Sequence, residues 1–358
     1  MAELSRPSVL NTAGDDSAST LARQLLARPA FAVSWGGRTR LVSAAVDWRA
    51  RARSVQAVPA YRAQARAWRK IVAAWVACLP PGFGSAEVLP MDWLPADVAH
   101  LDPVDAVIGT PGPFQAVLVR LGNRRDDYRI EAIAKILVST SDGARARVGT
   151  EASAMRESII HGIVPDVVGM GLVASHPFFV MRYVRGRPLG SGWQDVRRAH
   201  EAIAYQEAPV CHVPAREHPW LMGIAERFPE VQLDRLPSEV GVVRTHGDFA
   251  PWNVLRLRDG RVVLIDWEAS IREGLPHTDL AHFVLACERY LRRRTAQVAA
   301  RNAIRATAGL LRQPNARVGV LVALAAVARL TQEGSIGSGT GQGDYWRNVV
   351  QAATAVSS

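Results

Sequence analysis

The clearest regular pattern in the first hundred residues is an apolar side chain at every third or fourth position from Tyr61 to Leu79. This spacing, with basic residues at intervening positions, predicts an amphipathic helix over residues 61–79 that ends before the Pro80-Pro81 pair. Residues 80–103 are rich in Pro, Gly and Asp and are expected to form a linker. Residues 1–100 therefore form an N-terminal extension in this interpretation.

Between residues 101 and 185 the pattern changes to short apolar runs separated by turn-forming residues. Segments 105–108, 114–121 and 128–138 are separated by GTPGP and GNRRDD, which predicts an antiparallel meander. Residues 141–160 have helical spacing after a capping Ser141 or Asp142. Two more strands are expected on either side of the Ser-His-Pro turn at 175–177.

Beyond the boundary sequence RGRPLGSG at 185–192, the apolar spacing is mainly helical. It indicates helices in four segments: 193–208, 278–294, 296–312 and 316–332. A β-rich part followed by a mainly helical part predicts an α+β protein. We expect a small antiparallel sheet lobe over 101–185 and a larger helical lobe over 186–358.

Composition places the chain among ordinary globular proteins, with 358 residues, 48% hydrophobic and 21% charged. The apolar run at 318–328 is too short to span a bilayer, and the polar N-terminus lacks the pattern of a secretory signal. The three cysteines, Cys78, Cys211 and Cys287, lie far apart and form neither a disulfide framework nor a CxxC metal site. A cytoplasmic location without a membrane span is the simplest expectation.

A single stretch, THGDFAPWNVLRLRDGRVVLIDWE at 245–268, combines acids and an amide around a predicted hairpin. Four residues separate Asp248 from Asn253, and a predicted strand at 262–265 ends at Asp266. The turn at 258–261 should bring Asn253 and Asp266 together. Phosphoryl transfer needs a carboxylate beside the acceptor hydroxyl and hard oxygen ligands for Mg²⁺, and the spacing Asp-x4-Asn is that of kinase catalytic loops.

With HGDFAPWN, LIDWE and Asp-Leu-Ala at 279–281, the chain resembles the aminoglycoside phosphotransferase and choline kinase family. The resemblance implies a bilobal protein-kinase-like fold and an ATP- and Mg²⁺-dependent small-molecule kinase. It implies that Asp248 is the catalytic base and that Asn253 and Asp266 bind the metal. His246 would support the loop, and Asp279 would hold the loop backbone.

Two residues depart from the family pattern: Ala250 stands where many members have His, and Trp252 where many have Gly. The acceptor side of the loop should therefore differ from that of the antibiotic kinases. Trp252 could stack on an acceptor or simply pack within the lobe. Glu268 could support the metal ligands or be a solvated acid.

On the nucleotide side, Lys135 lies within the apolar strand IAKIL, where a kinase needs a cation for the α- and β-phosphates. An alternative without a role in nucleotide binding is that Lys135 extends to solvent from an edge strand. By resemblance to the family's helix start, Glu151 is the expected carboxylate partner, with Glu157 held in reserve. The turn at 108–112 would cover the phosphates, although it lacks GxGxxG. Residues 181–184, at the end of the β-rich part, would form the adenine hinge. The nucleotide-contacting residues expected from these two segments are Gly109, Thr110, Gly112, Arg182, Tyr183 and Val184.

The charge balance bears on the acceptor. Residues 269–358 contain five acids and eleven arginines, which suits a polycation poorly and favours a neutral or anionic alcohol. A sugar, an amino alcohol or a related metabolite is expected before an aminoglycoside.

Two other functions stay open beside the small-molecule kinase. Ala250, Trp252 and the poor glycine loop would also suit a kinase-fold regulatory protein that binds nucleotide but transfers little phosphate. The formal net charge of +10 alone would allow nucleic-acid binding, but the basic residues are spread along the chain without a dense tract, so no nucleic-acid partner is expected. The sequence leaves the oligomeric state open.

Overall fold

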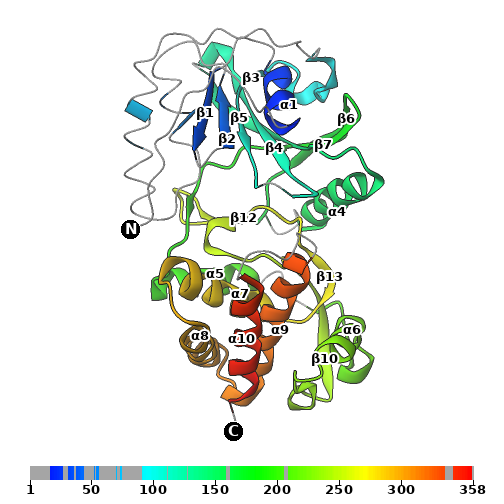
Figure 1. Cartoon of the computed structure of the whole chain (residues 1–358), viewed down its shortest axis with the longest axis vertical. Coiled ribbons are helices and arrows are strands. Elements are labelled where there is room, and N and C mark those ends of the chain that lie inside the picture. The colour runs from blue at the N-terminus through cyan, green and yellow to red at the C-terminus, as the bar shows by residue number, and fades with distance from the viewer. Residues whose placement is uncertain are drawn as a thin grey trace. The chain divides into compact units, whose positions relative to one another are not determined.

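The structure is a computed structural model of the chain. It describes residues 17–26, 31–35, 38–43, 52, 54–55, 70, 73–74, 91–110, 112–126, 128–158, 162–204, 209–334 and 342–356. The chain divides into two compact units, which are considered separately below (Figure 1). The first comprises Met1–Ala152 and Asp166–Tyr183, and the second comprises Ser153–Pro165 and Val184–Ser358.

A seven-stranded sheet forms the first unit, in the order β1-β2-β3-β4-β5-β7-β6, and every neighbouring pair is antiparallel. The strands are β1 (Phe31–Trp35), β2 (Arg38–Ser43), β3 (Asp102–Ile108), β4 (Ala116–Asn123), β5 (Arg129–Leu137), β6 (Val167–Val173) and β7 (His176–Arg182). The predicted meander is confirmed as β3, β4 and β5. Its first strand was predicted too short, because β3 begins at Asp102 within the predicted linker.

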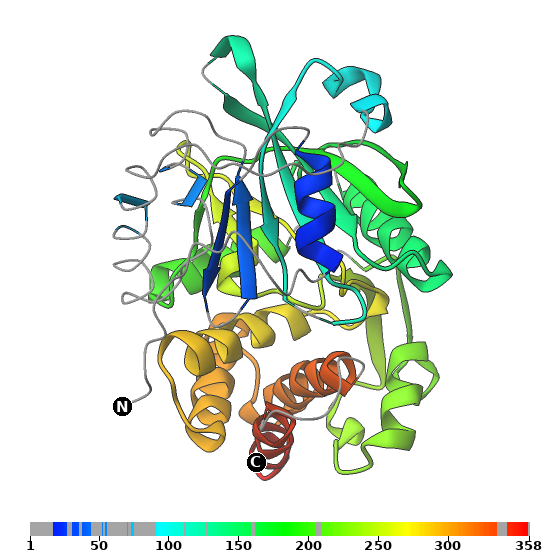
Figure 2. The same cartoon turned by 45° about the horizontal axis from the view of Figure 1, so that its top comes forward.

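Alternation of side chains explains the core of this unit. Residues 117, 119 and 121 of β4 and residues 132, 134 and 136 of β5 are fully buried at every second position, as expected where one face of a sheet packs inward. Helix α1 (Ser17–Leu25) packs against β3 and β4, and Figure 2 shows it lying across the sheet. The sequence did not predict α1, because its apolar positions follow a polar N-terminal segment.

Helix α4 (Asp142–Ser158) follows β5, where the sequence predicts a helix. The Ser141 hydroxyl accepts a hydrogen bond from the Ala144 amide at 3.2 Å, so Ser141 is the cap. The predicted turn between β6 and β7 is confirmed and contains Ala174 and Ser175, both with positive φ. The predicted helix at 61–79 lies outside the described residues, apart from isolated positions.

The second unit is mainly helical and carries two three-stranded sheets, in the orders β13-β10-β9 and β12-β11-β8. Its strands are β8 (Arg187–Pro188), β9 (Cys211–Pro214), β10 (Glu239–Thr245), β11 (Val254–Arg256), β12 (Val262–Leu264) and β13 (Ile271–Gly274). Its helices are α5 (Trp193–Ala204), α6 (Pro219–Arg227), α7 (Thr278–Ala286), α8 (Ala296–Leu311), α9 (Asn315–Gly334) and α10 (Gln342–Thr354).

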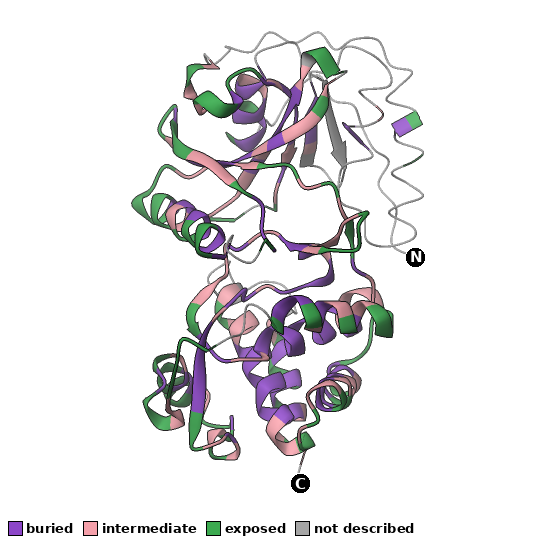
Figure 3. Ribbon diagram, turned by 180° about the vertical axis from the view of Figure 1, so that it is seen from behind, coloured by how far each residue is buried: buried purple, intermediate pink, exposed green. Residues whose placement is uncertain are grey.

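The core of the second unit lies between α7, α8, α9 and α10, which pack against one another. Every residue of α7 is buried, and residues 318–327 of the apolar run form the buried middle of α9, as predicted (Figure 3). The helix predicted over 278–294 is wrong in extent: α7 ends at Ala286 and continues as a π-helical turn, Cys287–Leu291. No single helix of the described chain has the length and hydropathy of a membrane span; α8 and α9 meet that test only jointly, as a pair bent by 119°.

Candidate active site

The loop after β10 is held by a side chain from a distant helix. The Asp279 carboxylate, in the first turn of α7, accepts hydrogen bonds from the backbone amides of His246 (2.6 Å) and Gly247 (3.0 Å). Asp279 is buried, and backbone amides are strong donors to a carboxylate. The loop is therefore fixed to the helical core in the way that the resemblance implies.

Gly247 allows the chain to turn at this point. Its φ is +76°, a conformation that side chains with a Cβ rarely adopt, and an added Cβ would lie 2.0 Å from the Ala269 carbonyl oxygen. The turn after Gly247 places Asp248 at the start of the segment that leads to Asn253.

His246 supports the loop from beneath. Its Nδ1 accepts a hydrogen bond from the Asp248 amide at 3.3 Å, so Nε2 carries the hydrogen toward the Ile265 carbonyl oxygen, 2.9 Å away. Burial lowers the pKa of His246, because desolvation disfavours the charged ring. A neutral His246 thus joins the loop after β10 to the end of the hairpin and lies against the Trp267 ring.

The hairpin brings the amide and the second acid together, as predicted. Strands β11 and β12 pair antiparallel with Val254 opposite Leu264, and the Ile265 amide donates to the Asn253 carbonyl at 2.9 Å. The Asn253 side-chain nitrogen donates to the Asp248 carbonyl (2.9 Å) and to Asp248 Oδ2 (3.2 Å). Asp248, Asn253 and the residue before Asp266 are therefore joined directly.

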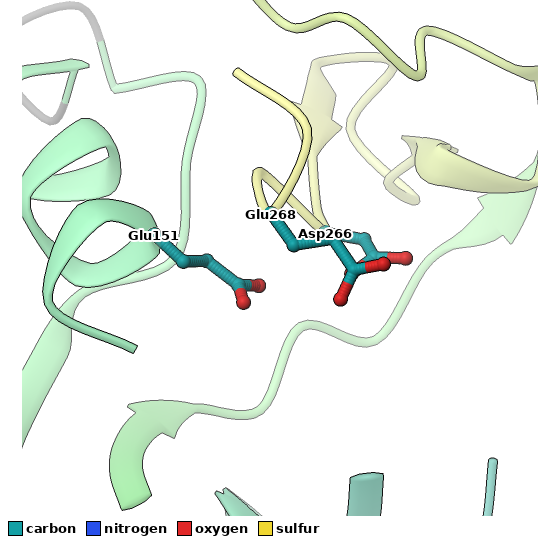
Figure 4. Close-up of side chains that lie close together, drawn as sticks. All are labelled: Glu151, Asp266 and Glu268. Carbon is teal, nitrogen blue, oxygen red and sulfur yellow. The ribbon is translucent and has the colours of Figure 1, made fainter. Parts of the chain in front are cut away.

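Asp266 and Glu268 supply carboxylates beside this hairpin. Asp266 has a positive φ of 67°, which ends the strand and redirects the chain, and its carboxylate has an oxygen within 4.8 Å of one on Glu268 (Figure 4). Because the Asn253 nitrogen donates to Asp248, the amide oxygen is the atom left for a cation. Carboxylate and amide oxygens are the ligands that Mg²⁺ prefers, so this donor set fits that ion.

Two further residues lie at the Asp248 carboxylate and a third holds one of them; the sequence did not predict any of the three. Arg329 of α9 donates from Nη1 to Asp248 Oδ1 at 2.8 Å, and His282 Nε2 of α7 lies 3.7 Å from the same oxygen. Gln332 accepts from Arg329 Nη1 (2.8 Å) and donates to the Gly247 carbonyl (3.2 Å). The one available sequence signal was that Arg329 directly ends the apolar run of α9.

The aromatic departure from the family pattern, Trp252, contacts Tyr290. Their rings meet edge to face with centroids 5.2 Å apart, and Tyr290 belongs to the π-helical turn after α7. Ala250, the other departure, is fully buried. Trp252 therefore packs within its own unit, and its partial exposure leaves part of the ring available to a ligand.

In the first unit, Lys135 and Glu151 form a buried ion pair. Lys135 Nζ lies 3.0 and 2.9 Å from the two carboxylate oxygens of Glu151, and the two side chains are 7% and 4% exposed. Lys135 lies on β5, an interior strand of the sheet, and is buried, so it does not extend to solvent from an edge. Glu157 instead pairs with Arg244. Of the two carboxylates considered from the sequence, Glu151 is thus the partner of Lys135.

The predicted phosphate loop forms a tight connection between β3 and β4. The Gly109 amide donates to the Ala116 carbonyl (2.8 Å), and the Gln115 side chain donates to the Gly109 carbonyl (3.3 Å). Gly112 accepts from the Gln115 amide, while Thr110 is exposed. These bonds define the loop's shape without assigning it a ligand.

The predicted hinge, residues 181–184, begins with the last two residues of β7. The Arg182 amide donates to the Asp166 carbonyl (2.9 Å) and the Tyr183 amide to the Glu131 carbonyl (2.8 Å). Both amide donors are thus committed within the first unit. Of the three hinge residues expected to contact adenine, Val184 is the one whose amide is not used in these two bonds.

Comparison with known proteins bears on the second unit. Residues 191–315 match the family model described as the phosphotransferase enzyme family (APH). That segment contains His246, Asp248, Asn253, Asp266 and Asp279. No curated protein sequence matches the chain.

Several solved structures are similar at low identity. An ethanolamine kinase from Plasmodium vivax is 10% identical over 85% of this chain and 92% of its own, with a TM-score of 0.44. The choline kinase LicA from Streptococcus pneumoniae is 14% identical over 70% and 94%, with a TM-score of 0.43. The aminoglycoside phosphotransferase APH(3'')-Id from Streptomyces rimosus is 16% identical over 72% and 93%, with a TM-score of 0.36. At these values the likenesses carry no argument about substrate or mechanism. The match to the phosphotransferase enzyme family over residues 191–315 confirms, for that segment, the family resemblance that its catalytic motif indicated.

Proposed function

We propose that the protein is an ATP- and Mg²⁺-dependent kinase that transfers the γ-phosphate of ATP to a hydroxyl of a small molecule. The observation that carries the proposal is that Asn253 is hydrogen-bonded to Asp248 and, through the hairpin, to Ile265, the residue before Asp266. Asp279 and His246 hold this arrangement inside the segment that matches the phosphotransferase family. The buried Lys135–Glu151 pair supports it independently, since kinases hold their phosphate-binding lysine in this way.

In this proposal Asp248 orients the acceptor hydroxyl and receives its proton at the carboxylate. The Asp248 side chain is 20% exposed, so an acceptor can reach it. Asn253 and Asp266 would hold Mg²⁺, whose charge offsets that of the phosphate oxygens when it is bound. Lys135 would bind the α- and β-phosphates, with Glu151 fixing its ammonium group.

The acceptor we expect is a sugar, an amino alcohol or a related metabolite rather than an aminoglycoside. The excess of arginines over acids in residues 269–358 supports this ranking. A cytoplasmic location stays a prediction.

The first prediction tests the base. Asp248→Asn keeps the size and a hydrogen-bonding oxygen but removes the proton acceptor, so turnover should fall by about a hundred- to ten-thousand-fold. ATP consumption over a panel of sugars, amino alcohols and antibiotics measures this, and calorimetry with ATP and Mg²⁺ should show nucleotide affinity largely unchanged.

Each other outcome identifies a different error. Equal turnover in wild type and Asp248→Asn would show that another group is the base. Nucleotide binding without transfer to any panel member would favour the regulatory protein. Robust phosphorylation of kanamycin would overturn the acceptor ranking.

A further inference from the structure

The carboxylate proposed as the base is in contact with a positive charge. Arg329 Nη1 lies 2.8 Å from Asp248 Oδ1. His282 lies 3.7 Å from the same oxygen, but burial lowers its pKa to about 3, so its ring is neutral near pH 7. Within the described contacts of Asp248, Arg329 is therefore the residue that carries the positive charge.

Arg329 is fixed in place rather than loosely associated. The same nitrogen donates to Gln332 Oε1 at 2.8 Å, and Gln332 in turn donates to the Gly247 carbonyl at 3.2 Å. Helix α9 thus contacts the catalytic loop at two successive residues, Gly247 and Asp248. The Arg329 side chain is 18% exposed, so solvent screens its charge less than that of a surface arginine.

Three other acids of the second unit are bound by groups other than Arg329. Asp279 accepts from the loop backbone, and the fully buried Glu288 is bound by Arg292 and by Asn302 (2.7 Å). Asp344 pairs with Arg347. A polycationic acceptor would therefore have to approach Asp248 past the guanidinium of Arg329, with these carboxylates already occupied.

We propose that Arg329 is a specificity-determining residue that disfavours acceptor alcohols with an ammonium group near the reacting hydroxyl, and so selects neutral or anionic alcohols. The inference rests on the proposed function of Asp248. Because Arg329 already pairs with the Asp248 carboxylate, an ammonium group beside a hydroxyl bound there gains little attraction from that carboxylate and is repelled by the guanidinium. It narrows the expected acceptors by removing amino alcohols.

The test compares acceptors that differ in charge but little in shape: glucose with glucosamine, and ethylene glycol with ethanolamine. For each pair the ratio of kcat/KM values is measured in the wild type, Arg329→Gln and Arg329→Lys. The wild type should prefer the member without an ammonium group by at least about ten-fold, as expected for repulsion between charges a few ångströms apart. Arg329→Gln should narrow that preference about ten-fold, and Arg329→Lys should retain it.

The ratio of kcat/KM values within a pair of acceptors separates charge selection from a general loss of activity, because a misplaced Asp248 slows transfer to both acceptors equally. Arg347→Gln removes a positive charge at a 71% exposed position and should leave every ratio unchanged. The wild-type ratio needs no variant, so it remains informative if Arg329→Gln does not fold.

Three results would count against the inference in distinguishable ways. A wild-type preference for the amino member would overturn it, and so would ratios that are the same in the wild type and Arg329→Gln, while transfer itself would uphold the kinase function. Absence of transfer from the wild type to every member of every pair would overturn the proposed function, and this inference with it.

Discussion

At the scale of single residues, Gly247 is a position in the loop after β10 where an added side chain would overlap the backbone. Gly247→Ala would put a Cβ 2.0 Å from a backbone oxygen and also force a side-chain-bearing residue into a φ of +76°. We expect the free energy of unfolding to fall by at least about 2 kcal/mol, because both the steric overlap and the backbone strain must be relieved by moving the loop. Urea unfolding followed by circular dichroism measures this.

Gly260 provides the matched control for that prediction. Its φ is +89°, but nothing lies within 4 Å of the Cβ that Gly260→Ala would add. This variant should lose only the conformational part, about 1 kcal/mol. If both variants lost the same free energy of unfolding, the overlap with the Ala269 carbonyl oxygen would cost nothing. Steric overlap would then not be the reason that residue 247 is a glycine.

Residues of the site differed in how far the sequence could predict them. Asp248, Asn253 and Asp266 lie in one short stretch, so local spacing and a hairpin turn sufficed to bring them together. Arg329 contacts Asp248 across 81 positions, and its pairing depends on how α9 packs in the second unit. The spacing of residues along the chain does not predict such a long-range contact, and an arginine at the end of an apolar helix is more often exposed to solvent.

At the scale of elements, the pair Lys135–Glu151 joins β5 to α4 within the first unit. Glu151→Gln would leave a buried ammonium without its counter-charge, which typically costs about 3–5 kcal/mol of stability. It should also raise the KM for ATP, because Lys135 would no longer be held in one position. Urea unfolding and initial rates at varied ATP concentration measure the two effects.

The double variant Lys135→Met/Glu151→Leu separates stability from function. Replacing a buried ion pair by apolar residues often restores stability, whereas it cannot restore a phosphate-binding cation. Glu157→Gln is the control, since Glu157 is 51% exposed and its pair with Arg244 should contribute less than about 1 kcal/mol. Full ATP affinity in the double variant would show that Lys135 is only structural.

Elements with a strong local pattern were predicted well, and those defined by their partners were not. The strands β4 and β5 show period-two alternation, and α9 carries a long apolar run, so all three were recognised from the sequence. Strand β10 is a short apolar segment whose identity depends on pairing with β9 and β13. The turn Cys287–Leu291 continues α7 in sequence pattern but is π-helical, a change of hydrogen bonding that the spacing of apolar residues does not reveal.

At the scale of the whole molecule, the order of patterns was enough for the fold class. A run of strands followed by a run of helices predicts an α+β protein, and the structure has a seven-stranded antiparallel sheet in one unit and a mainly helical second unit. The first hundred residues were less accessible from sequence. There, the sequence suggested a short strand around residues 40–44, where β2 lies and pairs with β3. It did not predict β1, or α1, which packs against β3 and β4.

Buried histidines make the stability of the molecule depend on pH. Burial lowers the pKa of His282 from 6.5 to about 3, and it also lowers those of His246 and His218. Below pH 6.5 these histidines are protonated in the unfolded chain but stay neutral in the folded protein. The free energy of unfolding should therefore fall as the pH falls toward 3. His282 alone contributes a slope approaching about 1.4 kcal/mol per pH unit.

Urea unfolding between pH 8 and pH 5 measures this slope in the wild type and in His282→Gln, which cannot titrate at this position. In His282→Gln the change of the unfolding free energy with pH should be smaller by the contribution of one histidine. His212→Gln, at an exposed position, should leave the slope unchanged. An unchanged slope in His282→Gln would mean that His282 is protonated in the folded protein. In that case two cations would contact Asp248, and the charge selection assigned to Arg329 would have to be shared between them.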